Sequence, residues 1–487
     1  MSDDSSLILG IDLGTSAVKV VALAADGALV GESEASFSTL SALPLQAEQA
    51  PSDWIDALVR AMAVMHSSAG ETLEPNWRER VAAIGLTGQL PTLVCLGETT
   101  PIAPAITWND GRADEWVASR LDARQRAAMY SRTGMPIDGR YLAPMLRYHF
   151  GDRMHEVRTL LSAKDYLLWT LTDQRFTEPS TAAGYGLYDL RTGAFSEELA
   201  NFWQVPTGLL PPLQQSNSLA GPLSAGGAAL LGLQSGVPVS TGAADSVCTA
   251  YTLAGLNERI VAIGCGSSTV IVGASATLRL DPQARYLLTP HVVAGWYGRE
   301  MDLLATGTGH RWLSGLLGWR EEELDVRAAD SVPGARGLLF PPYLAGGEQG
   351  ALWNPQLSGA ILGLTLRHTA ADVARAFLEG VFFETRRCIE VLAENTPVDL
   401  VRVSGALVRF PTSLQMLADI LGRSVEVSLE RSAAAVGAAW LARPLTGEEP
   451  CERRRKSEGR AIRPAPTSAR IYQQIYPRYL ERAQACA

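Results

Sequence analysis

Short apolar runs separated by glycine-rich turns open the chain. Leu7–Ile11 and Val18–Ala24 are apolar enough to predict two buried strands. Asp26-Gly27 marks a hairpin turn after the second run, so the residues from Leu29 onward are expected to add a third strand. The pattern predicts a meander whose first two strands are joined by the loop Asp12-Leu-Gly-Thr-Ser.

A second set of strands and polar loops begins about halfway along the chain. Pro238–Thr241 predicts a short strand that leads into Gly242-Ala-Ala-Asp245. Arg259–Ile263 predicts a strand that runs into Gly264-Cys-Gly-Ser-Ser, and Thr269–Val272 predicts the strand after that loop. The plan of strand, Gly/Ser/Thr loop and strand is therefore repeated, which indicates an internal duplication.

A chain of 487 residues is too long for one ordinary core, so two large α/β domains are expected. The repeated plan predicts an N-terminal domain of residues 1–236 and a C-terminal domain of residues 237–487, with the active site in the cleft between them. Further strands are predicted at Val81–Thr87, Leu93–Leu96 and Val401–Val403, and helices at Trp54–Met65, Thr369–Ala393, Leu414–Leu421, Ala433–Ala442 and Thr467–Ala485.

Composition and charge exclude several classes of protein. With 47% hydrophobic and 19% charged residues, the chain is expected to bury sizeable cores and to be a soluble globular protein. A net charge of −9 argues against a nucleic-acid partner, because the basic run at 453–456 is short and phosphate binding needs a concentrated basic face. No apolar run reaches the roughly 18 residues that span a bilayer, and residues 1–6 are too polar for a signal peptide.

The six cysteines form no CxxC pair, which predicts reduced thiols in the cytoplasm instead of disulfides or a zinc site. They are Cys95, Cys248, Cys265, Cys388, Cys451 and Cys486. The six histidines are equally dispersed, so the sequence offers little support for a metal held by imidazoles.

The first loop carries groups that suit phosphoryl transfer, a reaction that needs positioning, a metal ion and donors around the phosphates. Gly14 lets the backbone approach a phosphate closely, and Thr15 and Ser16 offer hydroxyl and N–H donors. Asp12 at the strand end is a candidate ligand of Mg²⁺. The alternative is a tight hairpin in which Asp12 is only a turn residue.

The second loop, Gly264-Cys-Gly-Ser-Ser, has two glycines and several hydroxyls that suit the far side of a polyphosphate. Its alternative is a flexible connection between strands. The helix that is expected to start at Thr306-Gly-Thr-Gly309 would present backbone amides to phosphate near Gly307, with Trp312 packed inward, or would be a plain helix start.

Asp245 follows a strand and a run of small residues, so its carboxylate can face a cleft without steric cover. In that position it is a candidate general base for a hydroxyl nucleophile. The alternative is a helix N-cap for Ser246–Leu253, the commoner role of an isolated aspartate.

Together these pieces resemble the FGGY carbohydrate kinases, most closely the xylulokinases, in one continuous order from about Leu7 to Ala442. The segments that carry the resemblance are Gly10-Ile-Asp-Leu-Gly-Thr-Ser-Ala-Val-Lys19, Gln49-Ala-Pro-Ser-Asp-Trp54, Ile84-Gly-Leu-Thr-Gly-Gln89, Trp108-Asn-Asp-Gly-Arg112, Ser162-Ala-Lys-Asp-Tyr166, Val237-Pro-Val-Ser-Thr-Gly-Ala-Ala-Asp245, Pro342-Tyr-Leu344 with Glu348, and Leu378-Glu-Gly380.

The resemblance implies two actin-like (ribonuclease H-like) domains, ATP with Mg²⁺, and transfer of the γ-phosphoryl to a primary hydroxyl of a ketopentose such as D-xylulose or of a related sugar or polyol. It implies Asp245 as the catalytic base and Asp12 as the metal residue. The substrate residues that it implies are Gln89, Leu90, Trp108, Asp110, Arg140, Asp245 and Ser246. The nucleotide residues are Gly14, Thr15, Gly264, Cys265, Gly266, Gly307, Gly405, Ala406 and Phe410. Besides a sugar or polyol and ATP or ADP, the partner left open is a second copy in a homodimer.

The chain departs from the family's pattern in the segments that are expected to bind the substrate. Leu90-Pro91-Thr92 replaces the usual Met-His-Gly, so a histidine contact to sugar hydroxyls is lost, and Met145 replaces a lysine while Arg140 offers a new contact. In the nucleotide loops, Ala406-Leu407 adds side chains and Cys265 replaces threonine. A non-catalytic sugar or nucleotide sensor and an actin-like structural ATPase are the alternatives, but Asp12 and Asp245 are both retained.

Overall fold

The computed structural model describes residues 6–67, 73, 76–428, 430, 432–447 and 459–484. The basic run at 453–456, Cys451 and Cys486 lie outside them. The chain forms two compact units. The first comprises residues 1–252, 288–297 and 432–453, and the second comprises residues 253–287, 298–431 and 454–487. The division differs from a single boundary after residue 236, because the strands that follow this residue pair within the first unit.

The first unit is built on a mixed sheet with the strand order β12-β13-β6-β1-β2-β3-β5, in which β14 also pairs with β6. The strands are β12 (Leu219–Pro222), β13 (Pro238–Ser240), β6 (Val81–Gly88), β1 (Leu7–Leu13), β2 (Ala17–Ala24), β3 (Leu29–Ser36), β5 (His66–Ser67) and β14 (Ala243–Ala244). A smaller sheet has the order β4-β8-β7-β9, comprising β4 (Glu48–Gln49), β8 (Ala105–Thr107), β7 (Thr92–Leu96) and β9 (Thr159–Leu161), and β10 (Tyr188–Asp189) pairs with β11 (Ala194–Phe195).

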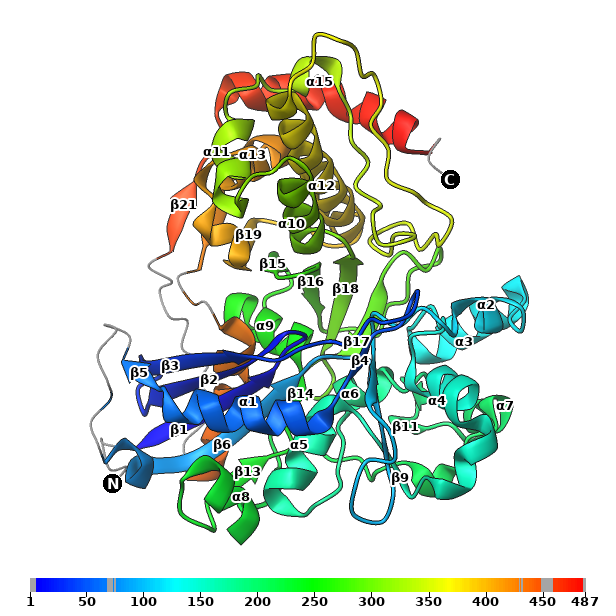
Figure 1. Ribbon diagram of the computed structural model, residues 1–487, viewed down its shortest axis with the longest axis vertical. Coiled ribbons are helices and arrows are strands. Elements are labelled where there is room, and N and C mark those ends of the chain that lie inside the picture. The colour runs from blue at the N-terminus through cyan, green and yellow to red at the C-terminus, as the bar shows by residue number, and fades with distance from the viewer. Residues whose placement is uncertain are drawn as a thin grey trace. The chain divides into compact units, whose positions relative to one another are not determined.

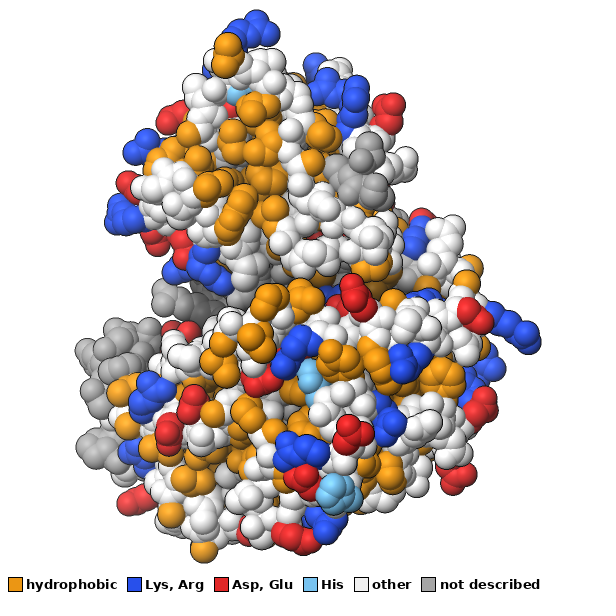
Figure 2. All heavy atoms as spheres, turned by 45° about the vertical axis from the view of Figure 1, so that its right-hand side comes forward, with side chains coloured by type: hydrophobic (Ala, Val, Ile, Leu, Met, Phe, Trp, Pro, Cys, Tyr) orange, Lys and Arg blue, Asp and Glu red, His pale blue; other side chains and the backbone are white. Residues whose placement is uncertain are grey.

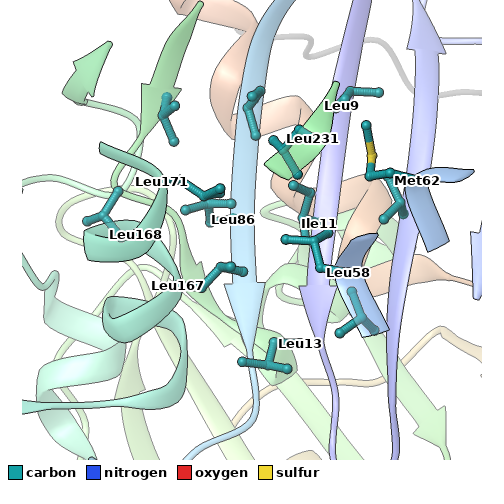
Figure 3. Packing of buried hydrophobic residues seen from close by; sticks show 14 of the residues in the cluster. Leu9, Ile11, Leu13, Leu58, Met62, Leu86, Leu167, Leu168, Leu171 and Leu231 are labelled. Carbon is teal, nitrogen blue, oxygen red and sulfur yellow. The ribbon is translucent and has the colours of Figure 1, made fainter. Parts of the chain in front are cut away.

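Both faces of this sheet are covered, which explains why β1 is a continuous apolar run. Leu9, Ile11 and Leu13 pack with α1 (Pro51–Ala63), α5 (Ala163–Thr172) and α8 (Ala225–Leu231), as Figure 3 shows. The alternate residue Ile8 packs instead against α14 (Ala433–Ala442) on the opposite face. The helix α14 therefore belongs to the first unit, although it lies near the end of the chain.

Most of the remaining helices of the first unit lie together beside the smaller sheet, at the right of Figure 1. The remaining helices are α2 (Asp114–Ala118), α3 (Ala123–Thr133), α4 (Leu142–Phe150), α6 (Pro179–Ala183), α7 (Glu197–Trp203) and α9 (Asp245–Ala254), the last of which reaches the boundary between the units.

The second unit contains a mixed sheet with the order β18-β16-β15-β19-β20-β21. The strands are β18 (Tyr297–Leu303), β16 (Thr269–Ser275), β15 (Ile260–Cys265), β19 (Leu400–Gly405), β20 (Val425–Val427) and β21 (Arg460–Ile462), and β17 (Leu287–Pro290) lies at the boundary of the units. The helices are α10 (Gly307–Leu316), α11 (Glu321–Ala328), α12 (Ala370–Ala393), α13 (Pro411–Leu421) and α15 (Pro466–Ala483).

The two sheets repeat one pairing plan. In the first unit β1 is antiparallel to β2 and parallel to β6. In the second unit β15 is antiparallel to β16 and parallel to β19. The loop at Gly14 and the loop at Gly266 follow the first strand of each hairpin, so the predicted duplication of strand, loop and strand is confirmed.

Among the helices that the structure describes, none has the length and apolar character that crossing a membrane requires. On the face drawn in Figure 2, Lys and Arg side chains are scattered among Asp and Glu side chains, and they form no continuous basic surface there.

Candidate active site

The carboxyl ends of neighbouring strands bring Asp12 and Asp245 into one region of the first unit. Asp12 on β1 lies opposite Thr87 on β6, and Ala243 on β14 lies opposite the same Thr87. Asp245 follows directly after β14 and begins α9. Only β6 therefore separates the strand of Asp12 from the strand that leads to Asp245.

The Asp12 side chain is suited to a cation. It is 6% exposed, and its Oδ1 atom has no hydrogen-bond partner within the described part of the chain. Burial raises the pKa of this carboxyl, while Lys19 opposes the shift and Glu34 adds to it. No group of three or more His, Cys, Asp or Glu side chains among the described residues forms a metal site by itself. A Mg²⁺ ion, which keeps several waters, nevertheless fits one such carboxylate together with phosphate oxygens.

Asp245 is half-buried at the start of α9, where its Oδ1 accepts the N–H of Ser246 at 2.9 Å. It is the first residue of α9, and part of its side chain remains accessible. One turn further on, burial raises the pKa of the Cys248 thiol, and the nearby carboxylates of Glu178, Asp12 and Asp245 add to this shift. These acidic groups thus lie around the same thiol.

The loop after Asp12 is held by side chains from other elements. The N–H of Gly14 donates to the carbonyl of Ala17 at 3.0 Å, which closes a tight turn. Thr15 accepts twice: its carbonyl from Gln49 Nε2 at 2.8 Å and its hydroxyl oxygen from Trp108 Nε1 at 3.2 Å. The predicted substrate residue Trp108 and the predicted phosphate residue Thr15 are therefore in direct contact.

Gln89 belongs to the same network. It is buried, and its Nε2 donates to Gln49 Oε1 at 2.8 Å, an oxygen that also accepts Trp54 Nε1 at 3.0 Å. The Gln89 Oε1 atom has no partner among the described residues. Sequence reasoning did not single out Gln49 as a site residue, although it opens one of the segments that carry the family resemblance.

Leu90 forms part of an apolar wall. It packs against a buried cluster that includes Ala243 and Ala244, the residues that precede Asp245. Gly184 leaves room for it, since a Cβ on that glycine would lie 2.6 Å from Leu90 Cδ1. The replacement of the usual histidine segment therefore places aliphatic surface beside the strand that leads to Asp245.

Asp110 is almost fully buried, and its carboxylate is engaged inside the protein. It accepts the guanidinium of Arg112, with an Nη2–Oδ2 distance of 2.6 Å, and the N–H of Ala47 at 2.9 Å. Arg112 also contacts Glu48 at 2.6 Å. These contacts give Asp110 a role in holding its loop.

Arg140 lies in an acidic environment. Its Nε donates to Asp138 Oδ2 at 3.1 Å, and its Nη2 lies 3.1 Å from the same oxygen. Burial raises the pKa of the neighbouring Asp114 to about 6, and Asp138 adds to the shift while Arg140 opposes it. The positive charge of Arg140 is therefore offset by the nearby carboxylates of Asp138 and Asp114.

The second unit contains an open pocket at its glycine loops. The predicted nucleotide residues Cys265, Gly266, Gly307, Ala406 and Phe410 line it. Gly264 and Gly405 lie on the paired strands behind these residues, where Gly405 is opposite Cys265. Close packing requires glycine at Gly307 and Gly405, since a Cβ would lie 2.1 Å from the Gly266 carbonyl oxygen and 2.1 Å from the Cys265 carbonyl oxygen respectively.

His310 is a pocket residue that sequence reasoning missed. Its ring stacks on Phe410, with 4.9 Å between the centroids and 29° between the planes. It is 7% exposed, and neither ring nitrogen has a partner within the described part of the chain. Burial lowers its pKa, so the imidazole stays neutral. Trp312, expected to pack inward, is instead 49% exposed, because α10 turns His310 and Leu313 toward the core.

Comparisons with known proteins agree with this organisation. Models of the "FGGY family of carbohydrate kinases" match residues 7–252 with the N-terminal domain and residues 261–443 with the C-terminal domain. A gluconokinase of Bacillus licheniformis is 26% identical, covering 99% of this chain and 96% of that protein. A xylulose kinase of Staphylococcus epidermidis is 28% identical, covering 90% and 87%. The solved structure of a xylulose kinase from Lactobacillus acidophilus has a TM-score of 0.88 at 24% identity, covering 99% and 98%. The predicted actin-like, ribonuclease H-like α/β fold is confirmed by this likeness.

Proposed function

Because the chain belongs to the FGGY family of carbohydrate kinases, we propose that it transfers the γ-phosphoryl group of ATP to a primary hydroxyl of a ketopentose such as D-xylulose, or of a closely related neutral sugar or polyol. Membership of the family makes the chain a phosphotransferase with an alcohol acceptor that uses ATP.

The observation that carries the proposal is the placement of Asp245 one strand away from Asp12. Asp245 receives the proton of the acceptor hydroxyl, and its first task is to orient that hydroxyl, because the transition state of phosphoryl transfer is loose. Ser246 and Gln89 lie beside the same strand ends and take part in binding the sugar. The unpartnered Oε1 of Gln89 suits a sugar hydroxyl.

ATP is assigned to the pocket of the second unit. The loop amides around Gly266 and Gly307 and the start of α10 suit phosphate oxygens, and the apolar walls near Ala406 and Phe410 suit the base. Asp12, whose Oδ1 has no partner among the described residues, would hold Mg²⁺, and the ion would supply positive charge for phosphoryl transfer. Gly14 and Thr15 are the proposed phosphate-binding residues of the first unit.

Charge favours a neutral acceptor over an aldonate. Arg140 is the only basic side chain among the predicted substrate residues, and Asp138 and Asp114 already balance it. Asp110 lies in the same region, but its carboxylate is already paired with Arg112. A substrate carboxylate would therefore meet acidic groups without an uncommitted cation from this set.

Transfer of radiolabelled γ-phosphate from ATP tests this function directly. The panel consists of ketopentoses, polyols and aldonates, with the Asp245→Asn variant as the control for background hydrolysis. We expect transfer to a ketopentose or polyol and little transfer to gluconate. Preferred transfer to gluconate would overturn the assignment of the acceptor, and binding of ATP and sugar without any transfer would identify a sensor in place of a kinase.

A further inference from the structure

The short segment before Asp245 is held by buried side chains that come from other elements. Lys164 Nζ donates to the carbonyl of Thr241 at 2.8 Å, and Thr87 Oγ1 donates to the carbonyl of Ala243 at 2.8 Å. The N–H of Ala244, the residue directly before Asp245, donates to Ser180 Oγ at 2.9 Å. The last of these bonds lies closest to the proposed base.

Ser180 is itself fixed by Glu178. The Ser180 hydroxyl donates to the Glu178 carboxylate at 2.7 Å, and the N–H groups of Ser180 and Thr181 donate to the same carboxylate at 2.8 and 2.7 Å. Glu178 and Ser180 are both fully buried. Because the hydroxyl hydrogen points to Glu178, the Ser180 oxygen presents its lone pairs to the N–H of Ala244.

A second connection leads from Glu178 to the same segment. The hydroxyl of Ser216 donates to Glu178 Oε2 at 3.0 Å, and the carbonyl of Ser216 accepts the N–H of Gly242 at 2.9 Å. Gly242 has a φ of 81°, and a Cβ there would lie 2.0 Å from the carbonyl oxygen of Leu86. The backbone from Gly242 to Ala244 is therefore held on both sides and has little freedom to shift.

We propose that Glu178, acting through Ser180, is a positioning residue that sets the direction of the Asp245 carboxylate. The inference rests on the proposed role of Asp245 as the base. A rotation of the peptide at Ala244 is passed directly to the next residue, and a displacement of about 1 Å at a reacting group can cost roughly a hundredfold in rate. The bond from Ala244 to Ser180 opposes that rotation.

A purely structural role is the competing explanation, since Glu178 is also the N-cap of α6. The two explanations differ in what they predict. Loss of a cap lowers the stability of the folded protein, measured as a lower Tm, and leaves the chemistry unchanged. Loss of a positioning contact lowers the rate of phosphoryl transfer and leaves the Michaelis constants nearly unchanged, because ground-state binding does not depend on it.

The first experiment compares Ser180→Ala with Ser196→Ala in single-turnover transfer on the best acceptor. Ser196 is the matched control, because its hydroxyl caps α7 through the N–H of Leu199. We expect Ser180→Ala to slow transfer about 10- to 100-fold, with KM for sugar and for ATP within about twofold. Ser196→Ala should retain the wild-type rate. An unchanged rate in folded Ser180→Ala protein would overturn the proposal.

The second experiment is a double-mutant cycle between Ser180→Ala and Asp245→Asn. If Ser180 acts through Asp245, Ser180→Ala should not slow transfer any further in the Asp245→Asn background. Independent roles would instead give additive losses of transition-state stabilisation. If Asp245→Asn alone keeps normal turnover, the proposed base is wrong. If Asp245→Asn loses turnover and the losses are additive, only the positioning role is wrong. Should Ser180→Ala not fold, Glu178→Gln, which keeps the size of the side chain, carries the same cycle.

Discussion

Asp12 lies directly opposite Thr87 in the parallel pairing of β1 and β6, and the Thr87 hydroxyl donates to the carbonyl of Ala243 at 2.8 Å. Through this one threonine, the strand of the proposed metal residue is tied to the segment that ends in the proposed base. Both carboxylates therefore depend on the same central strand of the first unit.

Replacement of Asp245 by asparagine should abolish most of the turnover. The substitution keeps the side-chain oxygen that accepts the Ser246 N–H, but it removes the proton acceptor. We expect kcat to fall about 10²- to 10⁴-fold, the usual contribution of a positioned base, with sugar binding within about tenfold of wild type. Asp26→Asn is the matched control, because its Oδ1 also accepts a nearby backbone N–H. Near-normal turnover of Asp245→Asn would reduce this residue to a helix-starting role.

Replacement of Asp12 by asparagine should change the response to Mg²⁺ more than the binding of sugar. The buried, unpartnered Oδ1 is the feature that suits the cation, and an amide is a weaker ligand. A titration of activity with Mg²⁺ should show a higher half-saturating concentration and a lower maximum. Asp26→Asn, at the exposed turn between β2 and β3, serves as the control and should leave the titration unchanged. Equal losses in Mg²⁺ response and sugar affinity would contradict the metal assignment.

Asp114 should make the stability of the protein depend on pH. Its pKa is raised from 3.8 to about 6 in the folded protein, chiefly by burial. Because the pKa of Asp114 is raised in the folded protein, its protonation adds to the free energy of unfolding. This contribution is complete below pH 3.8 and is lost as the pH rises through about 6. Asp114→Asn, which keeps an acceptor for the Gly139 N–H, should therefore raise Tm at pH 7.5 and much less at pH 4. The same change in Tm at both pH values would contradict the shift.

His310→Phe should raise the stability of the protein without ligand and lower its affinity for the nucleotide. A phenyl ring keeps the stack on Phe410 and removes two buried nitrogens that have no partner among the described residues, so Tm without ligand should rise slightly. If the imidazole bonds to the nucleotide, the affinity for ADP should fall by up to about tenfold, the value of one hydrogen bond. Calorimetric titration with ADP measures this, with the exposed Trp312→Phe on the same helix as the control. Unchanged affinity would place the nucleotide away from His310.

Local pattern was sufficient for most elements of the fold. The apolar run at Leu7–Ile11 became β1, and the Asp26-Gly27 turn joins β2 to β3, with Gly27 at a φ of 84°. Thr369–Ala393 became α12, with Thr369 as its N-cap. These features depend on residues close together in the chain, where periodicity, turn chemistry and capping act directly.

Pairing over long distances in the chain was decided only by the tertiary structure. The apolar character of 433–442 predicted a helix, but not that its backbone would pack on Gly10 and Gly85 of the first unit. Likewise, the strand before Asp245 was predicted, but not its pairing with β6. Such contacts join residues that are far apart in the chain, so the hydrophobic periodicity of a short segment does not predict them.

The sequence by itself determined the family, the strand–loop–strand plan and the candidate roles of Asp12 and Asp245, because small residues, carboxylates and turns mark these positions locally. Only the tertiary structure decided which groups support them. Glu178 and Ser180 hold the segment before Asp245, and Gln49 contacts Thr15, through hydrogen bonds. Trp312, expected to pack inward, is exposed, whereas His310 lines the pocket. The physical reason is that the position and role of a buried polar side chain are set by its hydrogen-bond partners. Those partners come from strands and helices that meet only in the folded chain.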